Sequence, residues 1–262
     1  MKKIIYLLIL SLGGFSCGKT SLDCFSDPGE ISSEVRRIDS SFTHLNLFDN
    51  IDVELVSSNR NFVEVIAGKN LLDAISTEFT IDTVIIEPVT PDTEGRKDIQ
   101  KILSIRNNSA CSFLRNDERP TKVIVYYTAL KGITYRSNGN LKTLGELKTD
   151  TLKVDIFEGS GSIDLNINTY ISYLNYHFGT ADLHVDGKSN VNYIYQVSYG
   201  PIDAARLITG YTYLESRSPN SCYIHADIAL GATINGPGNV YYTGSPEISL
   251  IGTGSGKLIN NN

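Results

Sequence analysis

The sequence predicts an all-β protein whose strands wind into a parallel β-solenoid, also called a parallel β-helix. Three observations lead to this class. A repeat of about twenty residues runs through the second half of the chain, turn residues recur at a similar interval, and almost no segment has the periodicity of an amphipathic helix. The composition agrees, because 15 Tyr, no Trp and one Met accompany many Asn, Thr, Ser and Gly residues.

The repeat is clearest in two series of buried-type positions. The first series steps by twenty residues, and the second has slightly looser steps. They are Val154, Leu174, Ile194, Leu214 and Ile234, and then Ile163, Leu183, Ile202, Cys222, Val240 and Leu258. Rungs stacked roughly 4.8 Å apart would bury each series as a continuous column.

Turn residues mark one corner of each rung. They are Gly139, Gly161, Ala181, Pro201, Asn220, Gly238 and Gly256. We expect glycine at such corners because they take a positive φ and pack closely against the next rung. The stretch "GTGSGKL", residues 252–258, is then the last corner and not a phosphate-binding loop, because Leu258 follows Lys257 where Ser or Thr would be needed.

The chain before residue 136 is less regular. Residues 35–135 contain alternating segments that indicate opening coils or a β cap of the same body, with one short helical turn at 69–76. Residues 136–262 hold the regular rungs. We therefore predict one solenoid domain over residues 35–262.

The N-terminal region fits a nucleotide-binding signature, GxxxxGKT, at residues 13–20. A phosphate-binding loop needs a helix directly after its glycines, whereas Asp27-Pro28-Gly29 predicts a turn. A secretory leader fits better, since a cationic pair at residues 2–3 precedes an apolar stretch at 4–12 and then small residues. We therefore expect no bound nucleotide.

The end of this leader resembles the cleavage site of a bacterial lipoprotein. Small residues lead to Ser16-Cys17, and in such proteins the cysteine is lipidated and becomes the mature N-terminus. We predict a signal peptide over residues 1–16, a lipid on Cys17 and a tether over 17–34. The expected location is the periplasm or the outer membrane, with the lipid anchor as the membrane attachment.

Charge and cysteine usage exclude several classes of partner. The net charge is −6 and no basic run is present, which argues against nucleic acid and against an anionic membrane surface. No CxxC pair or Cys/His cluster predicts a metal, and no cofactor is expected. Besides Cys17, the chain has Cys24, Cys111 and Cys222, for which one disulfide and one buried thiol is the economical interpretation. Cys222 occupies an aliphatic column and is expected to be buried.

One polar row is a candidate catalytic site. The outward neighbours of the second column include Asp164, His184 and Asp203 on adjacent rungs, an arrangement that suits a metal or acid–base chemistry on a carbohydrate. The alternative is a solvated row in which the histidine relieves repulsion between the aspartates. Corners only 18 to 22 residues apart leave no long loop to wall a groove, and no GxSxG elbow is present. We therefore expect no enzyme activity.

A tyrosine series is the candidate binding surface. Tyr173, Tyr193 and Tyr213 each precede a member of the first column, so strand alternation turns them outward. We expect them to stack as a ladder with Tyr195 at its side. The ladder either only stabilises neighbouring rungs or also binds a sugar or a protein partner.

Several pieces of the sequence resemble one known family. They are "AGKNLLDAISTEFTIDTVIIE", "RSNGNL", "GSGSIDLNI", "INGPGNVYYTGSP" and "GTGSGKL". In this order they are similar to the putative auto-transporter adhesin, head GIN-domain proteins, mostly lipoproteins of Gram-negative bacteria, over residues 35–262. The resemblance implies a right-handed parallel β-helix and no established catalytic or binding residues. It also implies a disulfide between Cys24 and Cys111, which match two cysteines that such members tend to carry.

The sequence therefore predicts a cell-envelope lipoprotein with a non-catalytic domain of the adhesion type. Its partner is expected to be a glycan or an envelope protein. The competing hypothesis is a carbohydrate-active enzyme that uses the row of Asp164, His184 and Asp203.

Overall fold

The computed structural model describes residues 27–86, 96–109 and 121–262, in which nineteen strands join in one continuous sheet. The strands are β1 (Ile31–Arg37), β2 (His44–Asp49), β3 (Asp52–Ser57), β4 (Phe62–Gly68), β5 (Ile75–Ile86), β6 (Arg96–Asn107), β7 (Lys122–Tyr127), β8 (Gly132–Ser137), β9 (Leu141–Thr143), β10 (Leu147–Gly159), β11 (Ser162–Tyr176), β12 (Asp182–Gln196), β13 (Ile202–Asp203), β14 (Leu207–Ser216), β15 (Cys222–His225), β16 (Ala229–Ile234), β17 (Val240–Thr243), β18 (Glu247–Ile251) and β19 (Leu258–Asn260). In the part of the chain that the structure describes, one 3-10 helix, η3 (Lys69–Ala74), falls within the helical turn predicted at 69–76.

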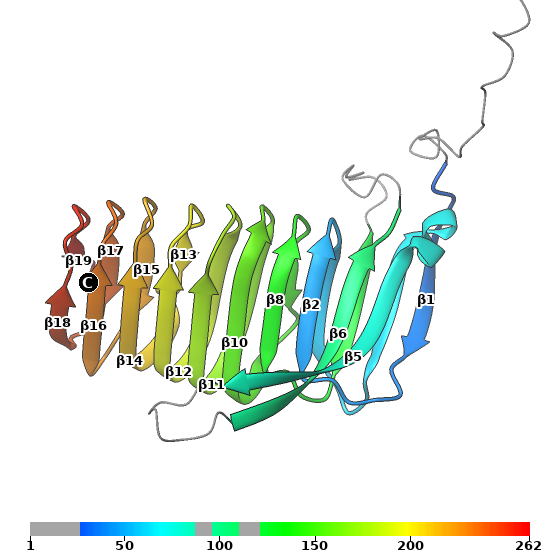
Figure 1. Ribbon diagram of the computed structural model, residues 1–262, viewed down its shortest axis with the longest axis horizontal. Helices are drawn as coiled ribbons and strands as arrows, with labels where there is room; N and C mark the ends of the chain where they lie inside the picture. The colour runs from blue at the N-terminus through cyan, green and yellow to red at the C-terminus, as the bar shows by residue number, and fades with distance from the viewer. Residues whose placement is uncertain (1–26, 87–95, 110–120) are drawn as a thin grey trace, which may run out of the picture.

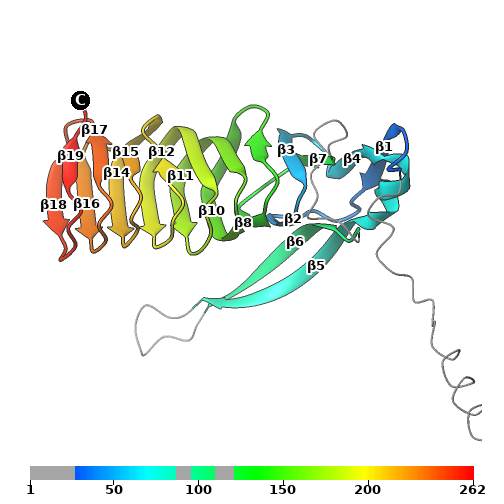
Figure 2. The same ribbon diagram turned by 90° about the horizontal axis from the view of Figure 1, so that it is seen from above.

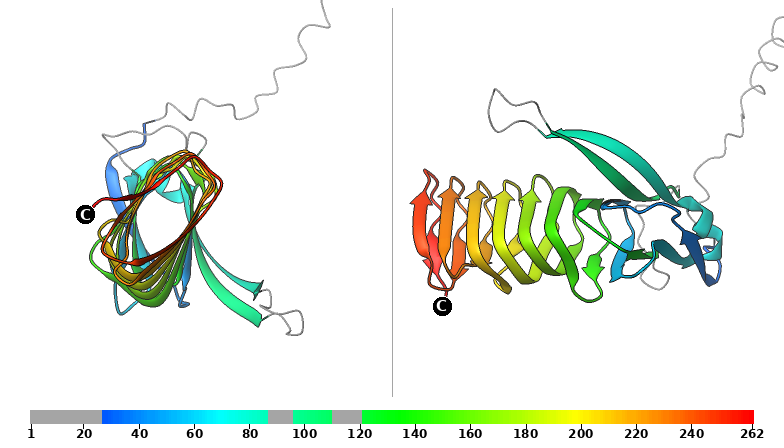
Figure 3. Two further views of the ribbon diagram at one scale, coloured as in Figure 1. Left: turned by 90° about the vertical axis from the view of Figure 1, so that its left-hand side faces the viewer. Right: turned by 90° about the horizontal axis from the view of Figure 1, so that it is seen from below.

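The strands wind into a β-solenoid with parallel rungs about 20 residues apart, as the repeat predicted. Figure 1 shows the rungs side by side along the long axis, and Figure 3 shows their oval cross-section when the body is viewed from one end. One sheet follows the order β2–β8–β10–β11–β12–β14–β16–β18. The other follows β3–β9–β11–β12–β13–β15–β17–β19, because the long strands β11 and β12 bend around the body and serve both sheets.

The N-terminal end of the solenoid is built from segments that are out of sequence order. Strands β2 and β3 pair in parallel with β8 and β9 on one side and with β6 and β7 on the other. Beyond β7 the pairing becomes antiparallel, first with β4 and then with β1, so this end is closed by strands of a different direction. Strands β5 and β6 form a long antiparallel hairpin that projects from the body (Figure 2).

The second aliphatic column has the predicted register throughout. Backbone pairing joins Ile163 to Leu183 and continues through Ile202, Cys222 and Val240 to Leu258. Its first five members are fully buried. The Cys222 thiol therefore lies inside the core as a free thiol, and burial raises its pKa.

The prediction of the first column is confirmed from Val154 to Leu214 and is wrong at its last member, Ile234. Val154, Leu174, Ile194 and Leu214 pair in order, but Leu214 continues to Ala232 instead of Ile234. The physical reason is a shorter connection. The chain advances eight residues from Asp203 to Tyr211 but only six between their paired residues, from Tyr223 to Ala229, so the constant step of twenty no longer holds.

Part of the interior is polar, which the aliphatic columns did not predict. Thr169 donates a hydrogen bond to Ser189 at 3.0 Å, and Ser172 donates to Asn192 at 2.8 Å, with all four side chains buried. Within the described residues, every buried side-chain nitrogen or oxygen has a partner. Hydroxyl and amide groups therefore fill this side of the core without leaving an unsatisfied polar atom.

The corner glycines are needed for close packing and not for a positive φ. A Cβ atom on Gly161 would lie 2.2 Å from the carbonyl oxygen of Gly139, and one on Gly256 would lie 2.1 Å from the carbonyl oxygen of Gly238. None of these corner glycines has φ in the left-handed region, so the expectation of positive φ was wrong. The carbonyl of the preceding rung lies directly against each Cα atom and leaves no room for a side chain.

Some sequence predictions fall outside the described residues. These are the signature at 13–20, the lipidated Cys17, and both members of the predicted disulfide, Cys24 and Cys111. Among the residues that are described, no helix is long and apolar enough to cross a bilayer.

The corner packing gives the first prediction. Gly161→Ala should lower the free energy of unfolding by about 1–3 kcal/mol, because its Cβ meets backbone that cannot move independently. Gly210→Ala is the matched control, since its nearest atoms would be 3.4 Å away and the change should stay within about 0.5 kcal/mol. Urea unfolding of both variants measures the difference. Equal midpoints would contradict the packing argument.

Candidate functional site

Three tyrosines form a stacked ladder on the sheet that contains β11, β12, β14, β16 and β18. The Tyr173 and Tyr193 ring centroids are 5.0 Å apart, and those of Tyr193 and Tyr213 are 5.4 Å apart, with interplanar angles of 11° and 20°. Tyr193 and Tyr213 are 38% and 42% exposed. The rings thus lie on the outer face, where alternation placed them, and each covers a face of its neighbour.

Stacking leaves only the two ends of the ladder with an uncovered ring face. At the Tyr173 end the next rung carries Lys153, whose ammonium group lies 3.0 Å from Asp155. At the Tyr213 end the next rung carries Gly231, followed by the small Ser249. The ladder is therefore not a broad flat platform, and its uncovered end is beside Gly231.

An open groove of about 440 Å³ lies along this part of the sheet. Its lining includes the three ladder tyrosines, Tyr195, Asn175, Glu215, Gly231, Thr233, Ser249 and Ile251. Aromatic rings and aliphatic residues, Ile251 among them, supply apolar surface, while an amide, a carboxylate and hydroxyls supply hydrogen-bonding groups. This combination is typical of ligand sites.

The charged groups beside the groove are paired with each other. Glu215 accepts a hydrogen bond from Arg217 and the two form an ion pair at 2.8 Å. Asp155 has Lys153 at 3.0 Å and accepts from the Asn175 amide at 3.1 Å. The groove is therefore lined by groups whose charges are largely compensated.

A second aromatic row runs next to the ladder and ends at Tyr195. The Arg136 guanidinium lies 4.5 Å from the centroid of the Phe157 ring, which stacks on His177 at 4.3 Å. His177 contacts Tyr195 in a tilted arrangement at 5.7 Å and also lies 3.1 Å from Asp155. The sequence analysis placed Tyr195 beside the ladder but missed the other three residues. Their spacing of roughly one rung was the signal that would have found them.

The predicted row of Asp164, His184 and Asp203 lies on the other sheet. Strand register places the three residues side by side, and the His184 Nδ1 atom is 3.9 Å from an Asp203 oxygen. This separation exceeds a hydrogen bond, and the His184 and Asp203 side chains are 44% and 50% exposed. Asp164 accepts a hydrogen bond from Ser162 at 2.8 Å. An open row of this kind lacks the enclosure that acid–base catalysis uses.

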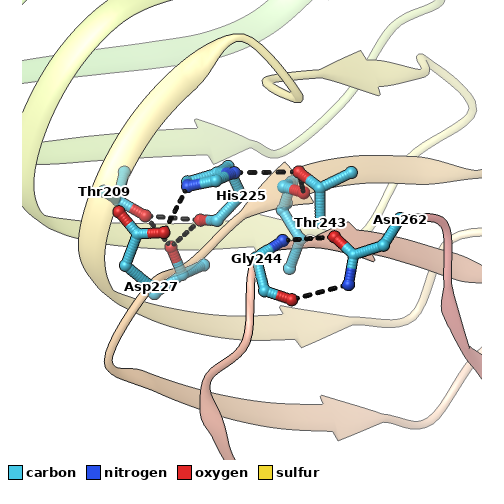
Figure 4. Close-up of polar contacts among 8 residues, drawn as sticks. Thr209, His225, Asp227, Thr243, Gly244 and Asn262 are labelled. Carbon is cyan, nitrogen blue, oxygen red and sulfur yellow. Dashed lines mark hydrogen bonds and ion pairs between the residues drawn. The ribbon is translucent and has the colours of Figure 1, made fainter.

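A tighter polar cluster near the C-terminal end centres on His225 (Figure 4). Its ring nitrogens lie 2.9 Å from the Thr243 hydroxyl and 2.9 Å from an Asp227 oxygen. The Asn262 side chain both accepts from the Gly244 N–H and donates to its carbonyl at 2.8 Å. The order Asp–His–Thr resembles a hydrolase triad, but the groove is on the other sheet. The contacts join successive rungs, which indicates a structural role.

Metal chemistry finds no support in the geometry of these residues. Over residues 27–86, 96–109 and 121–262, no three His, Cys, Asp or Glu side chains gather closely enough to hold an ion. Among the described residues, the tyrosine ladder brings apolar rings, hydrogen-bonding groups and a groove together.

Comparison with known proteins finds one matching family and several solved structures with a similar fold. A family model described as putative auto-transporter adhesin, head GIN domain, matches residues 41–246. A putative adhesin from Bacteroides fragilis has a similar structure, with a TM-score of 0.72 at 18% identity over 88% of this chain and 97% of its own. A protein from Parabacteroides distasonis described as a putative lipid binding protein reaches a TM-score of 0.62 at 20% identity over 88% and 96%. A putative adhesin from Parabacteroides merdae reaches 0.59 at 20% identity over 89% and 97%. At these identities the likeness concerns the fold alone. No curated protein matches the chain.

Two histidines on one sheet provide the second prediction. His225→Ala should lower the free energy of unfolding by about 1–3 kcal/mol, because the side chain is 14% exposed and removal leaves polar partners unpaired. His184→Ala should change it by less than about 0.5 kcal/mol, since that side chain is 44% exposed. Chemical denaturation of both variants tests this. A larger loss in the His184 variant would contradict the structural role assigned to His225.

Proposed function

The chain belongs to the head GIN domain family of putative auto-transporter adhesins, and we propose that it is a cell-envelope lipoprotein whose solenoid binds a surface partner without converting it chemically. The tyrosine ladder and its groove form the binding site. The lipid on Cys17 anchors the protein in the cell envelope as a periplasmic or outer-membrane lipoprotein.

The observation that carries this proposal is the coincidence of ladder and groove. Stacked rings stabilise neighbouring rungs without needing a hollow beside them, yet the groove lies along all three tyrosines. Tyrosine rings offer apolar area at a low entropic cost, together with a hydroxyl for hydrogen bonding. These properties suit recognition more than they suit catalysis.

The position of the groove along the solenoid also supports a binding role. The leader precedes β1, which lies at one end of the body, whereas Gly231 and Ser249 lie in the last rungs at the other end (Figure 1). A chain anchored through Cys17 would hold the N-terminal end near the membrane. The free end of the ladder would then point away from the bilayer, where a partner is accessible.

The enzyme hypothesis has less support. Its three residues, Asp164, His184 and Asp203, are exposed on a sheet other than the one that contains the groove. General acid–base catalysis needs the reacting bond held within hydrogen-bond reach of the acid and base. No groove lining residue belongs to this row.

Anchoring gives the third prediction. Cells that express the full chain should incorporate labelled palmitate into the wild-type protein and not into Cys17→Ser, because only the cysteine can be acylated at the mature N-terminus. Cys222→Ser is the matched control and should label like the wild type, because Cys222 is buried in the solenoid. Label in Cys17→Ser equal to that in the wild type would refute the anchor.

Binding gives the fourth prediction. The triple variant Tyr173→Ser, Tyr193→Ser, Tyr213→Ser should lose at least about tenfold in affinity for isolated envelope fractions, because it removes the aromatic surface of the groove. Sedimentation of the purified mature domain with those fractions measures this loss. The unchanged far-UV circular dichroism of the variant would show that it still folds.

The control for this experiment is a second pair of stacked tyrosines. The Tyr223 and Tyr241 rings stack at 4.9 Å on the other sheet, away from the groove. The double variant Tyr223→Ser, Tyr241→Ser should bind like the wild type. If both variants lose affinity equally, the ladder has no special role in binding.

A further inference from the structure

We infer that the uncovered face of the Tyr213 ring, beside Gly231, is a subsite for one sugar ring of a neutral glycan. This inference rests on the proposed binding function and names the chemistry of the partner. It is carried by the way the ladder ends, by the groups around that end, and by their charge.

The first step concerns ring faces. Within the ladder, Tyr193 has both faces covered, by Tyr173 and Tyr213. A ligand ring that stacks face to face must therefore use an end of the ladder. The Tyr173 end is followed by Lys153, a side chain held by Asp155, so the Tyr213 end is the one available.

The second step concerns space. A Cβ atom on Gly231 would lie 2.9 Å from Cδ1 of Tyr213, so the ring of Tyr213 leans over this glycine. Gly231 is not in the left-handed region, and backbone conformation therefore does not require glycine there. On the following rung Ser249 is short and exposed. The Tyr213 ring thus fills the space over Gly231, and the short side chain of Ser249 leaves room for a ligand ring against the outer face of Tyr213.

The third step concerns the rim of this space. Thr233 and Ser249 contribute hydroxyls, Glu215 contributes a carboxylate, and Ile251 contributes an apolar side chain that is 68% exposed. A pyranose ring has C–H bonds on its face and hydroxyls at its edge. Its face suits the electron-rich face of tyrosine, and its hydroxyls suit the polar rim.

The fourth step concerns charge. Glu215 of the groove lining is paired with Arg217, and no Lys or Arg is among the described residues that line the groove, which gives an anionic ligand no cation to bind there. The whole chain carries a net charge of −6, which disfavours nucleic acid and acidic polysaccharides. An aromatic side chain from a protein would also stack on Tyr213, but it would leave the rim hydroxyls without partners. A neutral glycan uses both parts of the site.

The test uses the purified mature domain and an immobilised panel of neutral oligosaccharides of glucose, mannose, galactose and N-acetylglucosamine. The wild type should bind at least one member. Gly231→Leu should weaken that binding by at least about tenfold, because the new side chain takes the space over which the Tyr213 ring lies and displaces that ring from the subsite. Tyr213→Ala should do the same by removing the ring. Gly210→Ala, on the adjacent strand, should bind like the wild type, because its Cβ meets only ordinary contacts.

The outcomes separate this inference from the proposed function. Absence of binding to the whole panel overturns the glycan assignment, even if envelope binding remains sensitive to the triple tyrosine change. Glycan binding that survives Gly231→Leu overturns the placement of the subsite. Envelope binding that withstands periodate, which cleaves sugar diols, but not protease would identify a protein partner instead. If neither the triple ladder variant nor the double Tyr223 and Tyr241 variant loses affinity for the envelope fractions, the proposed function itself is rejected.

Discussion

The parallel hydrogen-bond pairing of one rung with the next is the interaction on which this structure depends. It places each residue directly against the residue one repeat earlier, as when Ile163 pairs with Leu183 and Tyr173 with Tyr193. Side chains of one kind then form columns without any further requirement. The aliphatic columns make the core, the glycine column makes a tight corner, and the tyrosine column makes a surface ladder. Fold and candidate site thus have the same physical origin.

The same pairing explains how much the sequence could reveal. Where the repeat length is constant, spacing alone gives three-dimensional neighbours, and so the column that begins at Ile163 and the ladder from Tyr173 to Tyr213 were predicted correctly. Where the chain is two residues shorter, between Tyr223 and Ala229, the step of twenty fails, and Ala232 takes the place expected for Ile234. The row from Arg136 to His177 was missed because its members are of different residue types, although each is one rung from the next.

The strand pairing of the N-terminal half could not be predicted from the sequence, for a different reason. Strands β2 and β3 receive neighbours from β6 and β7 on one side and from β8 and β9 on the other, so their partners lie far along the chain. No fixed interval connects such partners, and alternation within each strand identifies a strand but not its neighbour. The groove was not predicted either, because its lining combines residues of different types from several rungs, Gly231 among them. A repeat in the sequence identifies the residues that recur. It does not show so readily the rung at which the repeat is interrupted.

That interruption also distinguishes the two tyrosine columns, because only the ladder is followed by a glycine. A stacked column satisfies its own ring faces, so its stabilising role and its binding role compete everywhere except at its ends. In the pair of Tyr223 and Tyr241, the next rung carries Ile259, a large side chain in the place where a ligand ring would stack. In the ladder, the corresponding place after Tyr213 belongs to Gly231, and a groove is found there. Two columns of the same residue type therefore differ in the space at their ends because of one following residue. Under the proposed function, this difference would make the ladder, and not the pair of Tyr223 and Tyr241, accessible to a partner.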